Sequence, residues 1–173
     1  MNTADFVFQA LASVRSSVAL TLDGLSPEQL MQRPGPESNP VGWLIWHMAR
    51  MQDRGMSALT GESQLWISGH WHERYGMSAD PDDTGMGHDA AQVSAFTAPD
   101  AATLLEHYDA VLESTQKYLS ELDPGDIDRT VETPPPPATV GDRLLAVLNG
   151  NMQHVGQAGY VRGLNEGRRW HPR

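Results

Sequence analysis

Apolar residues recur at steps of three and four along two stretches of the first third of the chain, which predicts two amphipathic helices. We expect the first to begin with Thr3 as its N-cap. We expect the second to have Asn39 as its N-cap and Pro40 as its first helical residue, with Gly61 following its last turn. The first apolar stripe is Val7, Leu11, Val14, Val18 and, after one seven-residue step, Leu25; the second is Val41, Leu44, Met48, Met51, Gly55 and Leu59.

The same spacing predicts two more long helices in the second half of the chain. One begins near Pro99 and ends at Asp123, and the other runs from Thr139 to about Leu164. Between them, the segment RTVETPPPPATVGD contains four prolines and is expected to be extended. A short helix is also predicted over residues 89–96.

Together these elements predict an all-α fold, a four-helix bundle with two long crossover loops, as one domain over residues 1–173. The sequence shows no internal repeat. The connection from Gln64 to Thr97 carries no long helical period, and connections of this length often cover functional sites.

Composition and charge narrow the range of partners. The formal net charge is −10, and Lys117 is the single lysine of the 173 residues, which argues against nucleic acid and anionic membranes as partners. The absence of cysteine excludes disulfides and thiolate ligands. No apolar run approaches the length of a membrane span, and the N-terminal segment lacks a signal-peptide pattern, so we expect a cytoplasmic location.

Two histidines lie on inward faces of different predicted helices, His47 on the second and His154 on the fourth. Helix bundles build metal sites from side chains on facing helices, and neutral imidazole is a common ligand. A buried histidine can equally be a core residue hydrogen-bonded to a carbonyl group, and spacing alone does not separate these alternatives. Near His47, we expect Arg50 and Asp53 to lie on the helix surface or to act as capping partners.

The other histidines are interpreted from their surroundings. His70 and His72 alternate with a tryptophan in a predicted loop, where surface or loop packing is the simpler interpretation, although two imidazoles can bind metal. His88 ends the segment TGMGH, whose glycines let a loop approach a pocket. His107 is expected on the flank of its helix, without a functional role.

Two helical segments, NPVGWLIWHMARMQD and QHVGQAGYVRGL, together with QLWISGHWHERYG and TGMGH, resemble the DinB-like family, including its DUF664 branch. The resemblance extends over essentially the whole chain and implies a bundle that binds a divalent ion, nickel or zinc. The family uses one ligand on the second long helix and two spaced i, i+4 on the last. His47 and His154 match the first and last of these, whereas the middle position falls on Gly150, which has no side chain. Candidates for an additional ligand are His88, Asn151 and Gln157.

Known members of the DinB-like superfamily include thiol-dependent S-transferases and a mycothiol-dependent maleylpyruvate isomerase. The resemblance therefore implies a metal-dependent enzyme that takes a low-molecular-weight thiol as cosubstrate and acts on a small electrophile; it assigns no further catalytic residue. The alternative is a non-catalytic small-molecule-binding or stress-response bundle that has lost the metal site. Homodimers are common in the family, and an apolar flank of the bundle would support one.

Overall fold

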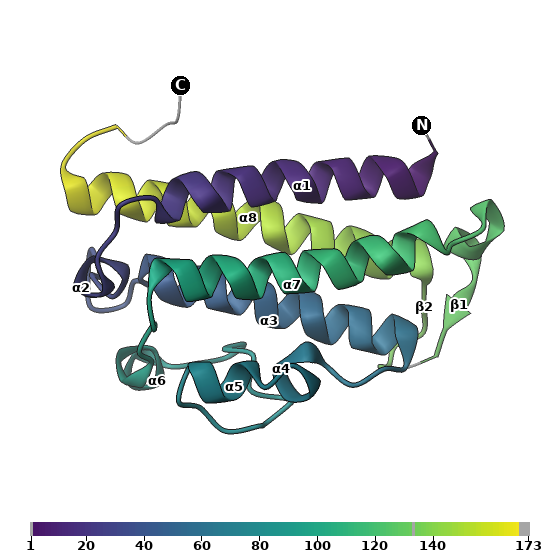
Figure 1. Cartoon of the computed structure of the whole chain (residues 1–173), viewed down its shortest axis with the longest axis horizontal. Coiled ribbons are helices and arrows are strands. Elements are labelled where there is room, and N and C mark those ends of the chain that lie inside the picture. The colour runs from purple at the N-terminus through teal and green to yellow at the C-terminus, as the bar shows by residue number, and fades with distance from the viewer. Residues whose placement is uncertain (1, 133, 170–173) are drawn as a thin grey trace.

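Four long helices dominate the computed structural model, which describes residues 2–132 and 134–169 (Figure 1). They are α1 (Thr3–Leu22), α3 (Val41–Thr60), α7 (Ala101–Ser120) and α8 (Val140–Glu166). Both α1 and α3 pack against α7 and α8, so the four helices enclose a shared core. The four-helix bundle predicted from the sequence is confirmed.

The ends of the helices follow local capping chemistry, with small shifts from the sequence prediction. Asn2 caps α1, so Thr3 is the first helical residue rather than the cap. The N-cap of α3 is Pro40, and Asn39 therefore lies outside the helix. Gly61 ends α3 at a φ of +75°, a left-handed conformation that glycine adopts without steric cost.

Buried apolar side chains form two clusters along the bundle. The cluster beside the start of α1 includes Leu11, Leu119 and Leu144. The larger cluster contains Trp46 and Tyr108, together with side chains from the long connection after α3. Full burial of one large apolar side chain stabilises the fold by roughly 1.5–3 kcal/mol, so these clusters supply most of the drive for helix packing.

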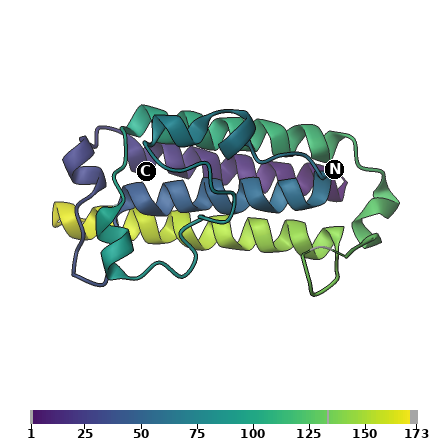
Figure 2. The same cartoon turned by 90° about the horizontal axis from the view of Figure 1, so that it is seen from below.

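The connection between α3 and α7 folds back over α3 rather than extending into solvent (Figure 2). As a result, every residue from Val41 to Arg50 is buried, on all sides of the helix. The short helices are α2 (Pro27–Leu30) before α3, and α4 (Leu65–Ser68), α5 (Trp71–Arg74) and α6 (Ala90–Ala95) within this connection. The predicted helix over residues 89–96 is confirmed as α6, whereas α4 and α5 were not predicted.

The proline-rich connection between α7 and α8 is more structured than the expected extended segment. It contains the 3₁₀ helix η1 (Pro124–Asp128) and an antiparallel pair, β1 (Thr130–Val131) and β2 (Ala138–Thr139). Thr139 pairs with Thr130 and also caps α8, which links the hairpin to the start of that helix. Among the residues described, none of the helices is long and apolar enough to cross a membrane.

Candidate functional site

His47 and His154 lie in contact where α3 packs against α8. Their ring centroids are 4.9 Å apart and the ring planes meet at 76°. His47 is buried, with 6% of its surface exposed, and His154 is half-buried. The two histidines predicted to share a site are therefore brought together by the packing of these helices.

The hydrogen bond of His47 fixes the position of its proton. Its Nδ1 lies 2.5 Å from the carbonyl oxygen of Thr84, which can only accept, so Nδ1 carries the hydrogen and Nε2 carries a lone pair. Burial lowers the pKa of His47, and the proximity of His154 and His88 lowers it further. The ring is therefore neutral at pH 7, which is the form that binds metal.

His154 has the matching arrangement on α8. Its Nδ1 lies 2.7 Å from Oε1 of Gln157, so this nitrogen donates and Nε2 is again the unprotonated atom. Gln157, a candidate ligand in the sequence, thus orients the ring of His154. Within the described residues, no hydrogen bond uses Nε2 of either His47 or His154.

Glycine is required at position 85 for the loop to approach His47. Gly85 has a φ of +82°, and a Cβ there would lie 2.7 Å from the rings of both Trp43 and Trp46 and 3.2 Å from Nδ1 of His47. Any side chain would push the neighbouring Thr84 carbonyl away from the ring. Of the two glycines in TGMGH, Gly85 is the one that allows the loop to lie against α3 beside His47.

His88 uses both ring nitrogens to hold this loop in place. Trp43 donates from Nε1 to Nδ1 of His88 over 3.3 Å, so the hydrogen of His88 resides on Nε2. That nitrogen donates to Oδ1 of Asp83 over 3.0 Å. In this arrangement His88 joins the loop to α3 and has no free nitrogen for a metal.

Arg50 attaches the same loop to α3 from inside the protein, which corrects its expected position on the helix surface. Its guanidinium is completely buried and donates to the carbonyl oxygens of Asp80, Pro81 and Asp83, each over 3.2 Å. It also lies 4.4 Å from the ring centroid of Trp66. Burial lowers the pKa of Arg50 to about 10, a value at which it remains charged at neutral pH.

Asp53 is buried as well. Of the two roles expected for it, on the helix surface or as a capping partner, the capping role is correct. Its carboxylate accepts the backbone N–H groups of Leu65 and Trp66, both over 2.8 Å, and so caps the start of α4. Burial raises the pKa of Asp53 in spite of these hydrogen bonds. Both carboxylate oxygens are therefore engaged by the fold.

Asn151 and Gly150 both lie about one turn before His154 on α8, and they differ in the side chain available to bind a metal. Asn151 is buried; its Oδ1 accepts from the hydroxyl of Tyr108 over 2.8 Å and its Nδ2 donates to the carbonyl of Val147 over 2.9 Å. Its amide thus joins α8 to α7. A Cβ on Gly150 would meet nothing within 4 Å, so this position is open.

A separate cluster on the long connection has the composition of a metal site. The ligand atoms of His70, His72 and Glu73 all lie within 4.8 Å of one another, and this group could hold a metal ion. It is the only such group of three or more histidine or acidic side chains among the described residues. The pair His47 and His154 accordingly has no third donor of this kind within that range.

His107 is completely buried, which corrects its expected place on a helix flank. Its Nδ1 lies 3.2 Å from the hydroxyl of Tyr75, and its ring stacks on Trp71 at 4.8 Å. Burial and the positive charges of Arg50 and Arg74 lower the pKa of His107 to about 3. Its position on α7 gave no signal of burial, because the residues that cover it come from α5 and the loop after it.

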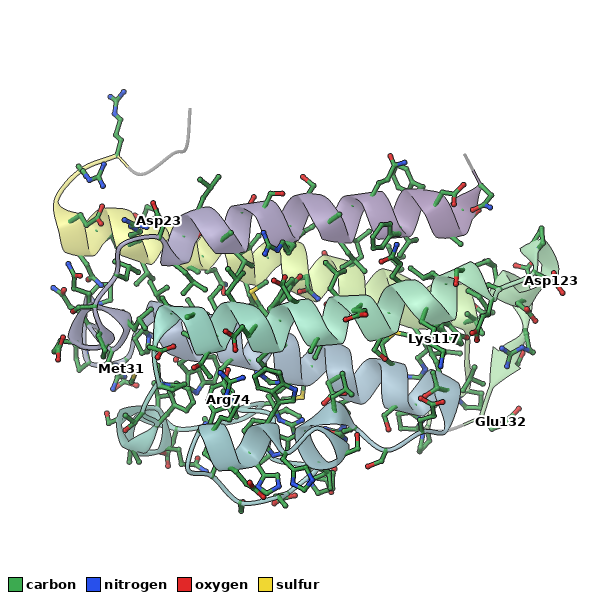
Figure 3. The ribbon with its side chains drawn as sticks, viewed as in Figure 1. Asp23, Met31, Arg74, Lys117, Asp123 and Glu132 are labelled. Carbon is green, nitrogen blue, oxygen red and sulfur yellow. The ribbon has the colours of Figure 1, made fainter. Side chains whose placement is uncertain are left out.

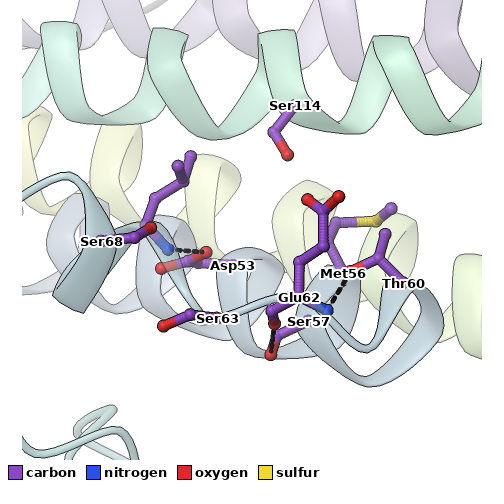
Figure 4. Close-up of a pocket in the computed structure, with 9 residues that line it drawn as sticks. Asp53, Met56, Ser57, Thr60, Glu62, Ser63, Ser68 and Ser114 are labelled. Carbon is purple, nitrogen blue, oxygen red and sulfur yellow. Dashed lines mark hydrogen bonds between the residues drawn. The ribbon is translucent and has the colours of Figure 1, made fainter.

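A polar pocket of about 230 Å³ lies between α3, α4 and α7 (Figure 4). Asp53, Glu62 and Ser114 line it, but none of the predicted ligands does. The Asp53 carboxylate is already hydrogen-bonded to the backbone of α4. The pocket therefore supplies no additional ligand to the site of His47 and His154.

Comparisons with known proteins agree with this architecture. The crystal structure of the conserved protein of a locus from Enterococcus faecalis matches with a TM-score of 0.88 and 25% sequence identity, covering 97% of this chain and 99% of that chain. A search of curated proteins gave no match. The family model of the DinB superfamily matches residues 10–158, and the chain therefore belongs to that superfamily.

Proposed function

We propose that this chain is a metal-dependent enzyme, a thiol-dependent S-transferase or isomerase that acts on a small electrophile. The observation that carries the proposal is the matched pair of imidazoles from α3 and α8. Their ring centroids are 4.9 Å apart, and each ring uses Nδ1 for a hydrogen bond to an oxygen. This leaves two Nε2 lone pairs on adjacent rings.

The residues present fit a divalent transition metal ion. A histidine ligand usually donates its second ring nitrogen to an oxygen, which fixes the tautomer and the ring direction; Thr84 and Gln157 supply such oxygens here. Imidazole suits nickel and zinc. Two protein ligands, beside the open space at Gly150, would leave several coordination positions for water and substrate.

The chemistry requires a sulfur atom that the chain cannot provide, since it contains no cysteine. A divalent ion held by His47 and His154 would lower the pKa of a low-molecular-weight thiol, so that a nucleophilic thiolate is available near neutral pH. The protein residues would then act by orientation. Thr84 holds the ring of His47, and Gly85 lies directly beside the same ring.

The alternative function, a non-catalytic bundle that binds a small molecule, is favoured by one specific observation. No third histidine or acidic donor lies beside His47 and His154 among the described residues. Catalytic zinc normally has three protein ligands. Under this alternative the two imidazoles would hydrogen-bond a ligand between α3 and α8.

The proposal includes a small-molecule substrate and a homodimer. Exposed apolar side chains on α8 would support the dimer; Leu145, Met152 and Tyr160 are each more than half exposed. The net charge of −10 opposes nucleic acid and anionic membranes as partners.

The test is the metal content of tag-free protein in the His70→Ala/His72→Ala background, which lacks the separate histidine cluster on the long connection, with and without His47→Ala or His154→Ala. We expect near-stoichiometric nickel or zinc in the background protein and a loss of at least about tenfold when either histidine is replaced. Thiol transfer would then be assayed with glutathione, cysteine and mycothiol against a chloronitrobenzene. Background protein that is metal-free, and that also fails to bind added nickel or zinc through His47 and His154, would contradict the enzyme and leave the binding bundle.

A further inference from the structure

Three donor side chains meet at α5, an element that contributes nothing to the pair on α3 and α8. The ligand nitrogens of His70 and His72 and a carboxylate oxygen of Glu73 all lie within 4.8 Å of one another. We propose that this cluster is a second metal site, which binds a divalent ion of the zinc and nickel class independently of His47 and His154.

The backbone brings the three donors together within four residues. His70 precedes α5 with a φ of +55°, a left-handed conformation that is uncommon for a residue with a side chain. Its Nδ1 lies 3.1 Å from Oε1 of Glu73. The side chains of His70 and Glu73 are 71% and 66% exposed, so solvent and metal reach them freely.

The residue between the two histidines anchors this turn to the bundle. Trp71 stacks on the buried ring of His107 at 4.8 Å, and the guanidinium of Arg74 lies 4.6 Å from its ring centroid. Arg74 also donates to Glu106 over 2.7 Å and to Thr103 over 3.1 Å, and Figure 3 shows it between α5 and α7. The inner side of the turn is thus fixed to α7, while His70 and Glu73 are exposed and His72 is half-buried.

The spacing of the donors fits a small ion. Zinc lies about 2.0–2.2 Å from nitrogen and oxygen ligands, which places tetrahedral donors roughly 3.3–3.6 Å apart. The contact of 3.1 Å between His70 and Glu73 is already close to this distance. His72 is half-buried and its ring centroid is 6.1 Å from that of His70, so the approach requires a rotation of the exposed His70 side chain toward it.

The donor set also selects the class of ion. Two imidazole nitrogens and one carboxylate oxygen suit zinc, nickel or copper, whereas magnesium and calcium prefer oxygen ligands throughout. Arg74, the next residue along the chain, is paired with Glu106 at 2.7 Å and does not compete for the carboxylate of Glu73. Three protein ligands would leave one position for water.

The decisive measurement is calorimetric titration of tag-free His47→Ala/His154→Ala protein with Zn²⁺. We expect one zinc per chain in this variant, with binding weakened at least about tenfold when His72→Ala or Glu73→Gln is added. Glu121→Gln, which removes an exposed carboxylate at the end of α7, is the matched control and should leave zinc binding unchanged.

A second measurement on wild-type protein avoids dependence on the folding of these variants. The ring ¹⁵N resonances of His70 and His72 should shift or broaden together when Zn²⁺ is added. Resonances that stay in place, or zinc binding unaffected by His72→Ala, would overturn the second site. Two results together would support the second site and contradict the proposed function. The His47→Ala/His154→Ala protein would retain its zinc, and in the wild type only His70 and His72 would hold zinc.

Discussion

At the scale of single residues, Gly150 is the position where one side chain would change the chemistry most. It lies one turn before His154 on α8, and a Cβ there would meet nothing within 4 Å. We predict that Gly150→His completes an i, i+4 pair with His154 and raises zinc or nickel affinity at least about tenfold. The measurement is metal titration in the His70→Ala/His72→Ala background, which removes the second proposed site.

Gly156 provides the matched control for this gain. It lies on the same helix, and a Cβ added there would likewise meet nothing within 4 Å. Two residues beyond His154, it faces a different side of α8, because successive helical residues are about 100° apart. Gly156→His should therefore leave the affinity unchanged, and an equal gain in both variants would contradict the geometry.

His107 predicts a specific dependence of stability on pH. Its pKa is about 3 in the folded protein, whereas an unfolded histidine titrates near 6.5. Between these values the unfolded chain binds the extra proton, so the free energy of unfolding decreases as the pH falls, by up to about 1.4 kcal/mol per pH unit. His107→Gln should therefore lose less stability than the wild type between pH 7.5 and pH 5.

Urea unfolding at the two pH values measures this difference. The lowered pKa of His47 contributes equally to both proteins and cancels in the comparison. The variant should retain up to about 2 kcal/mol more of its stability on acidification, the value for one proton over the range from pH 6.5 to 5. Identical pH dependence in the two proteins would show that His107 does not control it.

The residues predicted correctly from the sequence are those whose environment depends on helix periodicity. His47 and His154 follow the inward faces of α3 and α8, and they meet in the structure. Arg50 and His107 lie on faces that periodicity alone leaves to solvent, yet both are completely buried. The chain that covers them is the connection after Gly61, and no local pattern indicates that this segment folds back.

At the scale of elements, two glycines on α3 set the distance to neighbouring segments. A Cβ on Gly42 would lie 2.7 Å from Cβ of Ala98 and 3.1 Å from the carbonyl oxygen of Leu30, neither of which can rotate away. A Cβ on Gly55 would lie 2.8 Å from Cγ2 of Val147, which can change rotamer. We predict that Gly42→Ala destabilises the protein by about 1–3 kcal/mol, whereas Gly55→Ala stays within about 1 kcal/mol of the wild type.

The same substitution in the same helix makes this pair its own control. Both changes replace glycine by alanine, so the gain in helix propensity, at most about 1 kcal/mol, acts in the same direction. Urea unfolding curves give the two free energies directly. A greater loss of stability in Gly55→Ala would contradict the prediction. It would show that α3 packs more tightly against α8 at Gly55 than against Ala98 at Gly42.

The long elements were predictable from the sequence, and of the short ones in the long connection only the six-residue α6 was predicted. The four long helices contain enough turns to establish an apolar period, and their ends were predicted to within a few residues. The helices α4 and α5 have four residues each, and the hairpin has two residues per strand. Such elements depend on tertiary contacts: Asp53 caps α4 from α3, and Trp71 holds α5 against His107.

At the scale of the whole molecule, the loop after α3 connects the bundle to the candidate site. Arg50 and His88 both attach residues 80–88 to α3, and Thr84 then accepts the hydrogen bond from His47. The hydrogen bonds that satisfy the buried guanidinium of Arg50 therefore also hold in place the loop whose Thr84 carbonyl fixes the tautomer of His47. We infer that the loop and the site form one cooperative unit rather than a bundle with an attached lid.

An ion bound by His47 and His154 would bridge two helices from different halves of the chain, so unfolding must release it. At a free metal concentration 100 times the dissociation constant, this linkage stabilises the native state by about 2.7 kcal/mol, which for a chain of this length raises Tm by about 5–11 °C. We predict this shift with Ni²⁺ or Zn²⁺ in His70→Ala/His72→Ala protein, and its reversal by a chelator. Adding His47→Ala should abolish it, because one imidazole no longer joins α3 to α8; a shift that persists would place the responsible ion elsewhere.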